Sequence, residues 1–338
     1  MLILLFWAAE TLAAPPAEAQ VPLLQHVFVL VEENQNYDQV IGNTTAMPYL
    51  NSLAEKYGLA TNYFANTHPS INNYFYLTAG RRGTRPPFVG HSADLYPFAV
   101  GGPNVASILS AHGKTWKSYA ENLPRRGYIG GNHDAYAKRH NPFAYFETVR
   151  QSKAQRANIV PFEQLKSDLE HNSLPAYGFI VPNLFSDAHN NPITRKGAPC
   201  GDHAALQRAD KWLQENIGPL IESPAFQKGG LLIITFDEAC ASGPKADSRF
   251  DPAHPNVEGG GRVATVLVST RITPGTRSDR LYHHESVARL TLQALGINVF
   301  PGQAVIAPDM SDFFAQADSA SRHPCGTAAP GCALGQVH

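Results

Sequence analysis

Two clusters of carboxylate and amide side chains follow hydrophobic segments that lie far apart in the sequence. The segments are 26–31 and 231–236, and the clusters that follow them contain Glu33, Asn34, Asp237 and Glu238. Carboxylate and amide oxygens are the ligands that hard divalent cations prefer. If both segments are parallel strands, ligands gather beyond their carboxyl ends. The two clusters together predict a site for one divalent cation of unknown identity, whereas either cluster alone would be interpreted as ordinary polar loop residues.

Ser70 lies shortly before the apolar segment 75–79, which Gly80 closes. A helix that begins here would place the serine hydroxyl at its N-terminus, where free N–H groups and the helix dipole favour a phosphate. A nearby cation would lower the pKa of the hydroxyl and make it a nucleophile. The alternative is that Ser70 only caps the helix, which is the commonest task of a serine at that position.

Histidines next to predicted elements form a third candidate group. They are His140, His189 and His284, and the last of them follows His283 directly before a predicted helix. The chain has 14 histidines, so any single one would be interpreted as a surface residue. Three of them in loops that adjoin strands or helices favour a phosphate pocket or a set of proton-transfer groups.

The elements that must position these residues alternate between strand and helix. Strands are predicted over 26–31, 177–181, 231–236 and 263–268, and helices over 47–57, 104–112, 204–217 and 286–295. Continuous apolar strands are typical of a sheet that is buried on both faces. The pattern predicts an α/β fold with a mainly parallel central sheet and helices on both faces. It shows no internal repeat and no boundary between domains.

The composition and charge of the chain argue against a disordered protein and against a nucleic-acid binder. The chain has 338 residues, of which 43% are hydrophobic and 16% charged, as expected for a globular protein. Its formal net charge is −1, which argues against nucleic acid as a partner because phosphate neutralisation needs a basic excess. No segment after the first residues is long and apolar enough to predict a transmembrane helix.

The first residues are typical of an export signal. The apolar run 2–9 is too short to span a bilayer and is followed by small residues that end at 17–19. We predict a signal peptide over 1–19, a catalytic domain over 20–315 and a cysteine-containing tail over 316–338, and thus a secreted or periplasmic location. The alternative is an N-terminal helix that packs on the domain.

Four cysteines fit an oxidising compartment. Cys325 and Cys332 are close together in the tail, and Cys200 would pair with Cys240. None of the four belongs to a CxxC motif, which argues against a structural zinc site. Sequence alone leaves three pairings open, as well as four free thiols.

Six motifs in a fixed order resemble the bacterial and fungal acid phosphatase/phospholipase C phosphoesterase family, within the alkaline-phosphatase-like superfamily. They are Glu33-Asn34-x-x-Tyr37-Asp38, Thr67-His68-Pro69-Ser70-x-x-Asn73-Tyr74, Arg139-His140-Asn141-Pro142-Phe143, Pro182-Asn183 with Asp187-x-His189, Thr235-Phe236-Asp237-Glu238 and Tyr282-x-His284-x-Ser286. Each motif is weak alone, but their order over residues 25–297 is specific. The branch that the chain resembles most contains secreted acid phosphatases and phosphatidylinositol 3-phosphatases.

The resemblance implies roles for the candidate residues. Glu33, Asn34, Asp237 and Glu238 would hold the metal, with Ser70 beside it as the nucleophile that becomes phosphoserine. The phosphate pocket would be lined by His140, Asp187, His189 and His284, with His189 or His284 as the acid that protonates the leaving alcohol. Thr67, His68 and Asn73, which flank Ser70 in its motif, would contact the substrate.

The implied activity is hydrolysis of phosphomonoesters, either small molecules or lipid headgroups such as phosphoinositides. Two alternatives remain open at this point. One is a phospholipase C, although that branch follows its Asp-Glu pair with His-Gly-Gly where this chain has Ala239-Cys240-Ala241. The other is a secreted protein that binds a phosphate ligand without turnover, against which the intact Ser70 and both acidic clusters argue.

Overall fold

The computed structural model describes residues 20–83, 99–190, 196–240 and 259–314. The predicted signal peptide and the Cys325–Cys332 pair lie outside these residues. Within the described ranges, no helix has both the length and the hydrophobicity needed to cross a membrane.

One eight-stranded sheet forms the centre of the molecule, in the order β4-β3-β5-β1-β6-β7-β2-β8. The strands are β1 (His26–Glu32), β2 (Gly58–Ala60), β3 (Trp116–Ala120), β4 (Ile159–Pro161), β5 (Tyr177–Val181), β6 (Gly230–Phe236), β7 (Thr265–Val268) and β8 (Thr276–Ser278). β7 pairs antiparallel with both β6 and β2, and the other pairings in the described sheet are parallel. The predicted mainly parallel sheet is confirmed, with β7 as the exception.

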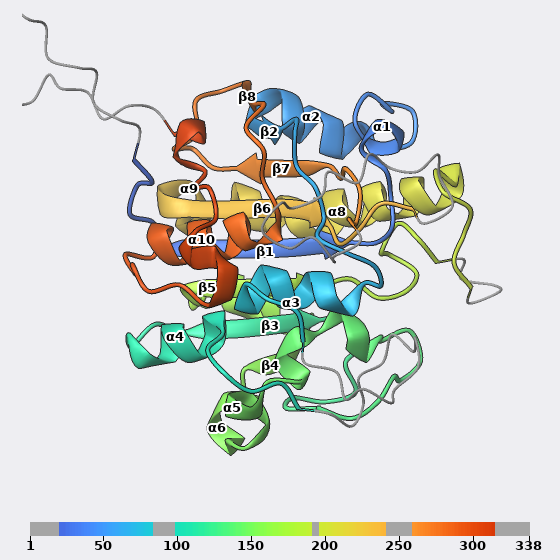
Figure 1. Ribbon diagram of the computed structural model, residues 1–338. Coiled ribbons are helices and arrows are strands. Elements are labelled where there is room, and N and C mark those ends of the chain that lie inside the picture. Colours follow the sequence, from blue (N-terminus) through green and yellow to red (C-terminus); the bar gives the residue numbers. More distant parts are fainter. Residues whose placement is uncertain (1–19, 84–98, 191–195, 241–258, 315–338) are drawn as a thin grey trace, which may run out of the picture.

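Helices cover both faces of the sheet, as predicted (Figure 1). The front layer contains α3 (Ile71–Ala79), α4 (Val105–Ala111) and α10 (His284–Ala294). The longer helices of the other layer are α2 (Pro48–Lys56), α7 (Gln164–Glu170), α8 (His203–Glu222) and α9 (Pro224–Gly229). The short helices are α1 (Tyr37–Val40), α5 (Glu147–Arg150), α6 (Lys153–Arg156), η1 (Lys138–His140), η2 (Pro142–Ala144), η3 (Gly302–Val305) and η4 (Ser311–Phe313).

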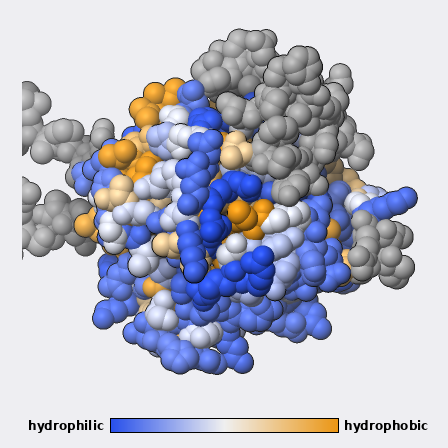
Figure 2. All heavy atoms as spheres, turned by 90° about the horizontal axis from the view of Figure 1, so that it is seen from below, coloured by the Kyte–Doolittle hydropathy of each residue, from blue (hydrophilic) through white to orange (hydrophobic). Residues whose placement is uncertain are grey.

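The two central strands show why this sheet is buried on both faces. Every residue of β6 is buried, as are the residues of β1 after His26. Their side chains alternate between the two helical layers, so both faces contribute to one hydrophobic core. The outer surface seen from below is mainly hydrophilic, with hydrophobic residues in small separate patches (Figure 2). Because β1 and β6 are buried, the polar residues that follow them lie at the carboxyl-terminal edge of the sheet.

Candidate active site

The ends of β1 and β6 bring the two acidic clusters together. The two strands are neighbours, and Glu32 is in register with Phe236, so Glu33 and Asp237 leave the sheet side by side. The backbone N–H of Asn34 donates to Asp237 Oδ1 at 3.0 Å. Asn34 has a φ of 52°, a left-handed conformation in which asparagine is enriched. The loop after β1 is therefore bonded to the end of β6.

Ser70 stands at the N-cap position of α3, but its side chain makes no cap hydrogen bond. Instead, Ser70 Oγ donates to Glu33 Oε2 at 3.2 Å. The residue is only 7% exposed. The hydroxyl thus lies against the acidic cluster, and the simple capping alternative does not describe its contacts.

Both carboxylate oxygens of Glu33 have donors. Tyr74 Oη donates to Oε1 at 2.6 Å, and His140 Nε2 lies 3.2 Å from the same oxygen. Asn34 Nδ2 donates to Oε2 at 2.7 Å. Burial acts to raise the pKa of Glu33, but His140, with Arg139 and Tyr74, outweighs it and lowers the pKa to about 2. The neighbours of Glu33 therefore favour its ionised form.

Asp237 and Glu238 have less compensation than Glu33. Burial raises the pKa of Asp237, and the charges of Glu33 and Glu238 raise it further. Asp237 Oδ2 is fully buried and has no hydrogen-bond partner among the described residues. Burial also raises the pKa of Glu238, against the effect of His68, whose Nδ1 lies 3.1 Å from Glu238 Oε2. The cluster therefore carries more negative charge than its neighbours offset.

The donors fit a divalent cation by their chemistry. Carboxylates, an amide and a hydroxyl are hard oxygen ligands, and the buried Asp237 Oδ2 needs a positive partner. The described residues contain no group of three His, Cys, Asp or Glu side chains whose positions could already hold a metal ion.

Two residues predicted to contact substrate are engaged in shaping the loop before Ser70. Asn73 Oδ1 accepts from the backbone N–H groups of Asn66 and Thr67 at 3.1 Å each, and Asn73 Nδ2 donates to the Thr67 carbonyl at 2.6 Å. The Thr67 hydroxyl donates to the His68 carbonyl at 3.1 Å. These contacts leave His68, with 27% of its side chain exposed, as the member of the three that lies at the surface.

His284 does not occupy the position that the sequence suggested. It is fully buried as the first residue of α10, with Nε2 2.7 Å from the Asp237 carbonyl and Nδ1 2.9 Å from Tyr63 Oη. A carbonyl only accepts, so Nε2 carries the proton and Nδ1 accepts from the tyrosine. Burial lowers the pKa of His284 to about 3. The His284 ring is therefore neutral, and both of its nitrogens are bonded. His284 positions Asp237 and does not fit the hypothesised role of the acid that protonates the leaving alcohol.

His140 also differs from its predicted placement. The resemblance put it in the phosphate pocket, but it contacts the ligand candidate Glu33 directly. Its ring stacks on that of Tyr74, with centroids 5.5 Å apart and planes 9° apart. His140 therefore favours the ionised form of Glu33. The sequence motif could not show this contact, because the two residues lie far apart in the chain.

The Asp187–His189 segment adjoins the end of β1. The Asp187 carbonyl accepts from Glu33 N at 2.8 Å, and Asp187 Oδ1 accepts from the backbone N–H groups of His189 and Asn190 at 3.0 and 3.1 Å. Burial raises the pKa of Asp187. His189 is half-buried, and its Nδ1 has no hydrogen-bond partner in the described part of the chain. Of the two candidate acids, His189 is therefore the one with a ring nitrogen that no described group bonds.

Two tyrosines of the site have no role predicted from the sequence. Tyr74 bonds Glu33, and Tyr63 bonds His284. Tyr74 follows Ser70 by four residues, and residues at that spacing lie on one face of a helix. This spacing could have predicted that Ser70 and Tyr74 contact the same partner, whereas no comparable signal precedes Tyr63.

The contact between His140 and Glu33 leads to a prediction about stability and pH. We expect His140→Gln to lower the free energy of unfolding of the metal-free protein by about 3–5 kcal/mol, because a buried carboxylate loses the imidazole partner that lies 3.2 Å from it and lowers its pKa. The pKa of Glu33 is about 2 in the folded chain and ordinarily 4.5. The unfolded state thus binds more protons between these values, and the stabilisation is lost as the pH falls through that window.

In His140→Gln, the fall in stability should begin at higher pH, because the pKa of Glu33 rises. Urea unfolding in chelator between about pH 2 and 6 measures this shift. His133→Gln is the matched control, since His133 pairs with Asp134 at 3.5 Å on the surface. Identical acid limbs for the two variants would contradict the proposed effect of His140.

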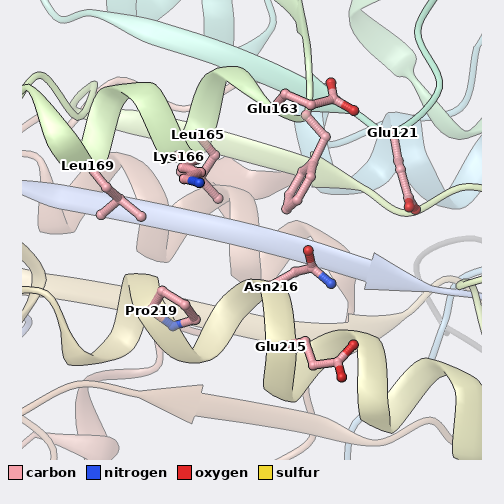
Figure 3. A pocket seen from close by; sticks show the side chains of 9 residues that line it. Glu121, Glu163, Leu165, Lys166, Leu169, Glu215, Asn216 and Pro219 are labelled. Atoms are coloured by element: carbon pink, nitrogen blue, oxygen red, sulfur yellow. The ribbon is translucent and has the colours of Figure 1, made fainter.

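A separate pocket lies between α7 and α8 (Figure 3). Its volume is about 480 Å³, and Leu165, Leu169 and Pro219 are among its lining residues. None of the predicted site residues lines it. The pocket and the acidic cluster are therefore different places on the molecule.

The fold places the chain among known structures of one class. It is similar to a Vibrio parahaemolyticus protein in the alkaline phosphatase superfamily, with a TM-score of 0.54, 14% identity, and coverage of 83% of this chain and 68% of that one. It is also similar to the PsFucS1 sulfatase from Pseudoalteromonas, with a TM-score of 0.54, 15% identity, and coverage of 87% and 72%. At these identities the likeness concerns the fold, which is alkaline-phosphatase-like, as predicted.

The sequence identifies the family within that class. The profile of the Phosphoesterase family matches residues 44–298, so the chain belongs to that family.

Two proteins named for their activity are similar along most of this chain. Phosphatidylinositol-3-phosphatase from Mycobacterium tuberculosis is 28% identical over 313 residues, which are 92% of this chain and 90% of that protein. Probable acid phosphatase from Kluyveromyces lactis is 28% identical over 289 residues, 82% of this chain and 60% of that protein. The chain thus spans less than two thirds of the yeast relative and nearly all of the mycobacterial one.

Proposed function

We propose that this chain is a divalent-metal-dependent acid phosphatase that hydrolyses phosphomonoesters through a phosphoserine at Ser70. The observation that carries the proposal is the Ser70 hydroxyl, which donates to Glu33 Oε2 at 3.2 Å at the start of α3. The hydroxyl thus lies between a carboxylate and a helix N-terminus. The helix N-terminus favours an anionic phosphate. Membership of the Phosphoesterase family supports the same reaction class.

The chemistry follows from the residues around Ser70. Glu33 orients the hydroxyl, which gives its proton to water, and Ser70 Oγ attacks phosphorus in line while the bond to the leaving alcohol breaks. His189 gives a proton to the leaving oxygen. Water then attacks the phosphoserine, which releases inorganic phosphate and restores the serine. A cation held by Glu33, Asn34, Asp237 and Glu238, with Ser70 beside it, would offset phosphate charge and lower the pKa of the serine hydroxyl.

An oxidising location forms part of the proposal. The Cys200–Cys240 disulfide, which was predicted and is confirmed, supports a secreted or periplasmic protein. The segment 1–19 would serve as the signal peptide. As substrates we propose small phosphomonoesters or phosphoinositide headgroups, since relatives are named acid phosphatase and phosphatidylinositol-3-phosphatase.

A substrate panel tests the activity. We expect release of phosphate from p-nitrophenyl phosphate and from phosphatidylinositol 3-phosphate, with loss of activity in chelator and recovery on addition of a divalent cation. Bis-p-nitrophenyl phosphate and phosphatidylcholine should be poor substrates. A preference for these diesters would favour the phospholipase C alternative, and phosphate binding without turnover would favour the binding-protein alternative.

A further inference from the structure

The Cys200–Cys240 disulfide joins two loops beside the acidic cluster. The Cα atoms are 5.8 Å apart, and the cysteines are separated by 40 residues in the chain. Cys240 directly follows Asp237, Glu238 and Ala239 at the end of β6, and Cys200 lies shortly before α8. The bridge thus attaches the segment that carries two ligand candidates to the start of α8.

The loop after β1 also contacts the bridge. The Cys240 N–H donates to Asn36 Oδ1 at 3.1 Å, and Cys240 Sγ lies 2.9 Å from the Asn34 carbonyl. On the other side, Cys200 Sγ lies 2.7 Å from Gln39 Oε1. Because disulfide sulfurs carry no proton, the sulfur contacts are packing contacts and not hydrogen bonds. Three loops therefore meet at the disulfide.

The loop after β1 has little regular structure to hold it in place. α1 (Tyr37–Val40) is one turn long, and a single turn is unstable on its own. The loop is held instead by contacts such as those of Gln35. Gln35 Nε2 donates to the Ala188 carbonyl at 2.7 Å, and Gln35 Oε1 accepts from Gly201 N at 2.9 Å. Gly201 is the neighbour of Cys200, so this support also depends on where the bridge holds that loop.

We propose that the Cys200–Cys240 bridge is a positioning element of the cation site, so that cation affinity depends on the redox state of the pair. The inference rests on the proposed function, because it concerns the same cation. With the bridge closed, the Asn34 N–H and Asp237 Oδ1 are held 3.0 Å apart. With the bridge open, the loops after β1 and β6 lose their common anchor.

Reduction requires an external dithiol. The dithiol gives two electrons and two protons to the S–S bond, which becomes two thiols, while the dithiol itself is oxidised to a disulfide. Attack would occur at Cys200, because Cys240 is only 7% exposed whereas Cys200 is half-buried. A chain with the open bridge would be a weak cation binder. An external disulfide, which takes up two electrons and two protons from the two thiols as it becomes a dithiol, would convert the chain to the tight-binding form.

Mn²⁺ binding by the metal-free full-length chain tests the inference, with free Mn²⁺ measured by electron paramagnetic resonance. We compare the oxidised chain, the dithiol-reduced chain after anaerobic removal of the reductant, and Cys200→Ser/Cys240→Ser. The control is Cys325→Ser/Cys332→Ser. Loss of support around metal ligands typically weakens affinity about 10- to 100-fold, so we expect a Kd at least about tenfold higher for the reduced chain and the first variant, but not for the control.

Activity provides the second readout. Excess Mn²⁺ should restore kcat on p-nitrophenyl phosphate in Cys200→Ser/Cys240→Ser, because the bridge positions the ligands and does not react. An unchanged Kd with only a lower melting temperature would overturn the inference, since the bridge would then be a general staple. If the oxidised chain bound no Mn²⁺ and released no phosphate, the proposed function would fail and the inference with it.

Discussion

Ser70→Ala should lower kcat on phosphomonoesters by at least about 10³-fold, the scale seen when a covalent nucleophile is removed. The fold should remain intact, because the Ser70 side chain makes no cap hydrogen bond to α3 and interacts with the carboxylates of the acidic cluster, Glu33 among them. Steady-state assays with purified protein measure the change in kcat. Ser110→Ala is a suitable control, since Ser110 Oγ bonds only within and beside α4.

A trapping experiment decides whether Ser70 or the neighbouring Thr67 is the nucleophile. Acid quenching during turnover should trap a phosphopeptide that contains Ser70, and mass spectrometry should place the phosphate on that residue. Near-normal turnover in Ser70→Ala, or a phosphate on Thr67, would refute the assignment of the nucleophile.

Asp237→Asn should have opposite effects on the metal-free and the metal-loaded protein. Without metal, the change removes a buried charge that Glu33 and Glu238 repel, while the amide oxygen can still accept from Asn34 N. We therefore expect a higher melting temperature in chelator. With Mn²⁺, the affinity should fall at least about 100-fold, and phosphatase activity should fall with it, because a ligand is lost.

Differential scanning fluorimetry with and without Mn²⁺ measures both effects of Asp237→Asn. Asp279→Asn is the control for the loss of one carboxylate, because Asp279 is exposed and it is its backbone carbonyl that accepts from Asn62 Nδ2. A metal-free Asp237→Asn protein that is less stable than the parent would show that the carboxylate is compensated in a way that we have not identified.

Long apolar segments made most of the fold predictable from sequence. β1 and β6 are buried on both faces, so their hydrophobic runs were unmistakable and their polar ends marked the site. β3 was missed because its sequence, WKSYA, mixes polar and apolar residues. Lys117 on that strand is accommodated by Asp168 at 2.6 Å, a partner on α7 that no local pattern reveals. The antiparallel direction of β7 is likewise set by its neighbours and not by its own sequence.

The candidate site was predictable only where residue type and strand position coincide. Carboxylates directly after buried strands indicated that Glu33 and Asp237 would be neighbours. The contacts of His284 and Asn73 were not predictable, because their partners are backbone groups and side chains that the tertiary fold brings near. A histidine in a conspicuous motif therefore gave no information about whether it faces a substrate or supports a neighbouring chain segment.

The front helical layer has a consequence for how the protein should tolerate mutation. Ser70 and Tyr74 on α3 bond both oxygens of Glu33, while His284 on α10 bonds the backbone of Asp237. α3 and α10 pack against each other, so their interface sets the spacing between the two acidic strand ends. Substitutions in this interface should therefore impair function more often than substitutions on α7, α8 or α9. The layer that contains these three helices is the better place for fusions, labels or surface redesign.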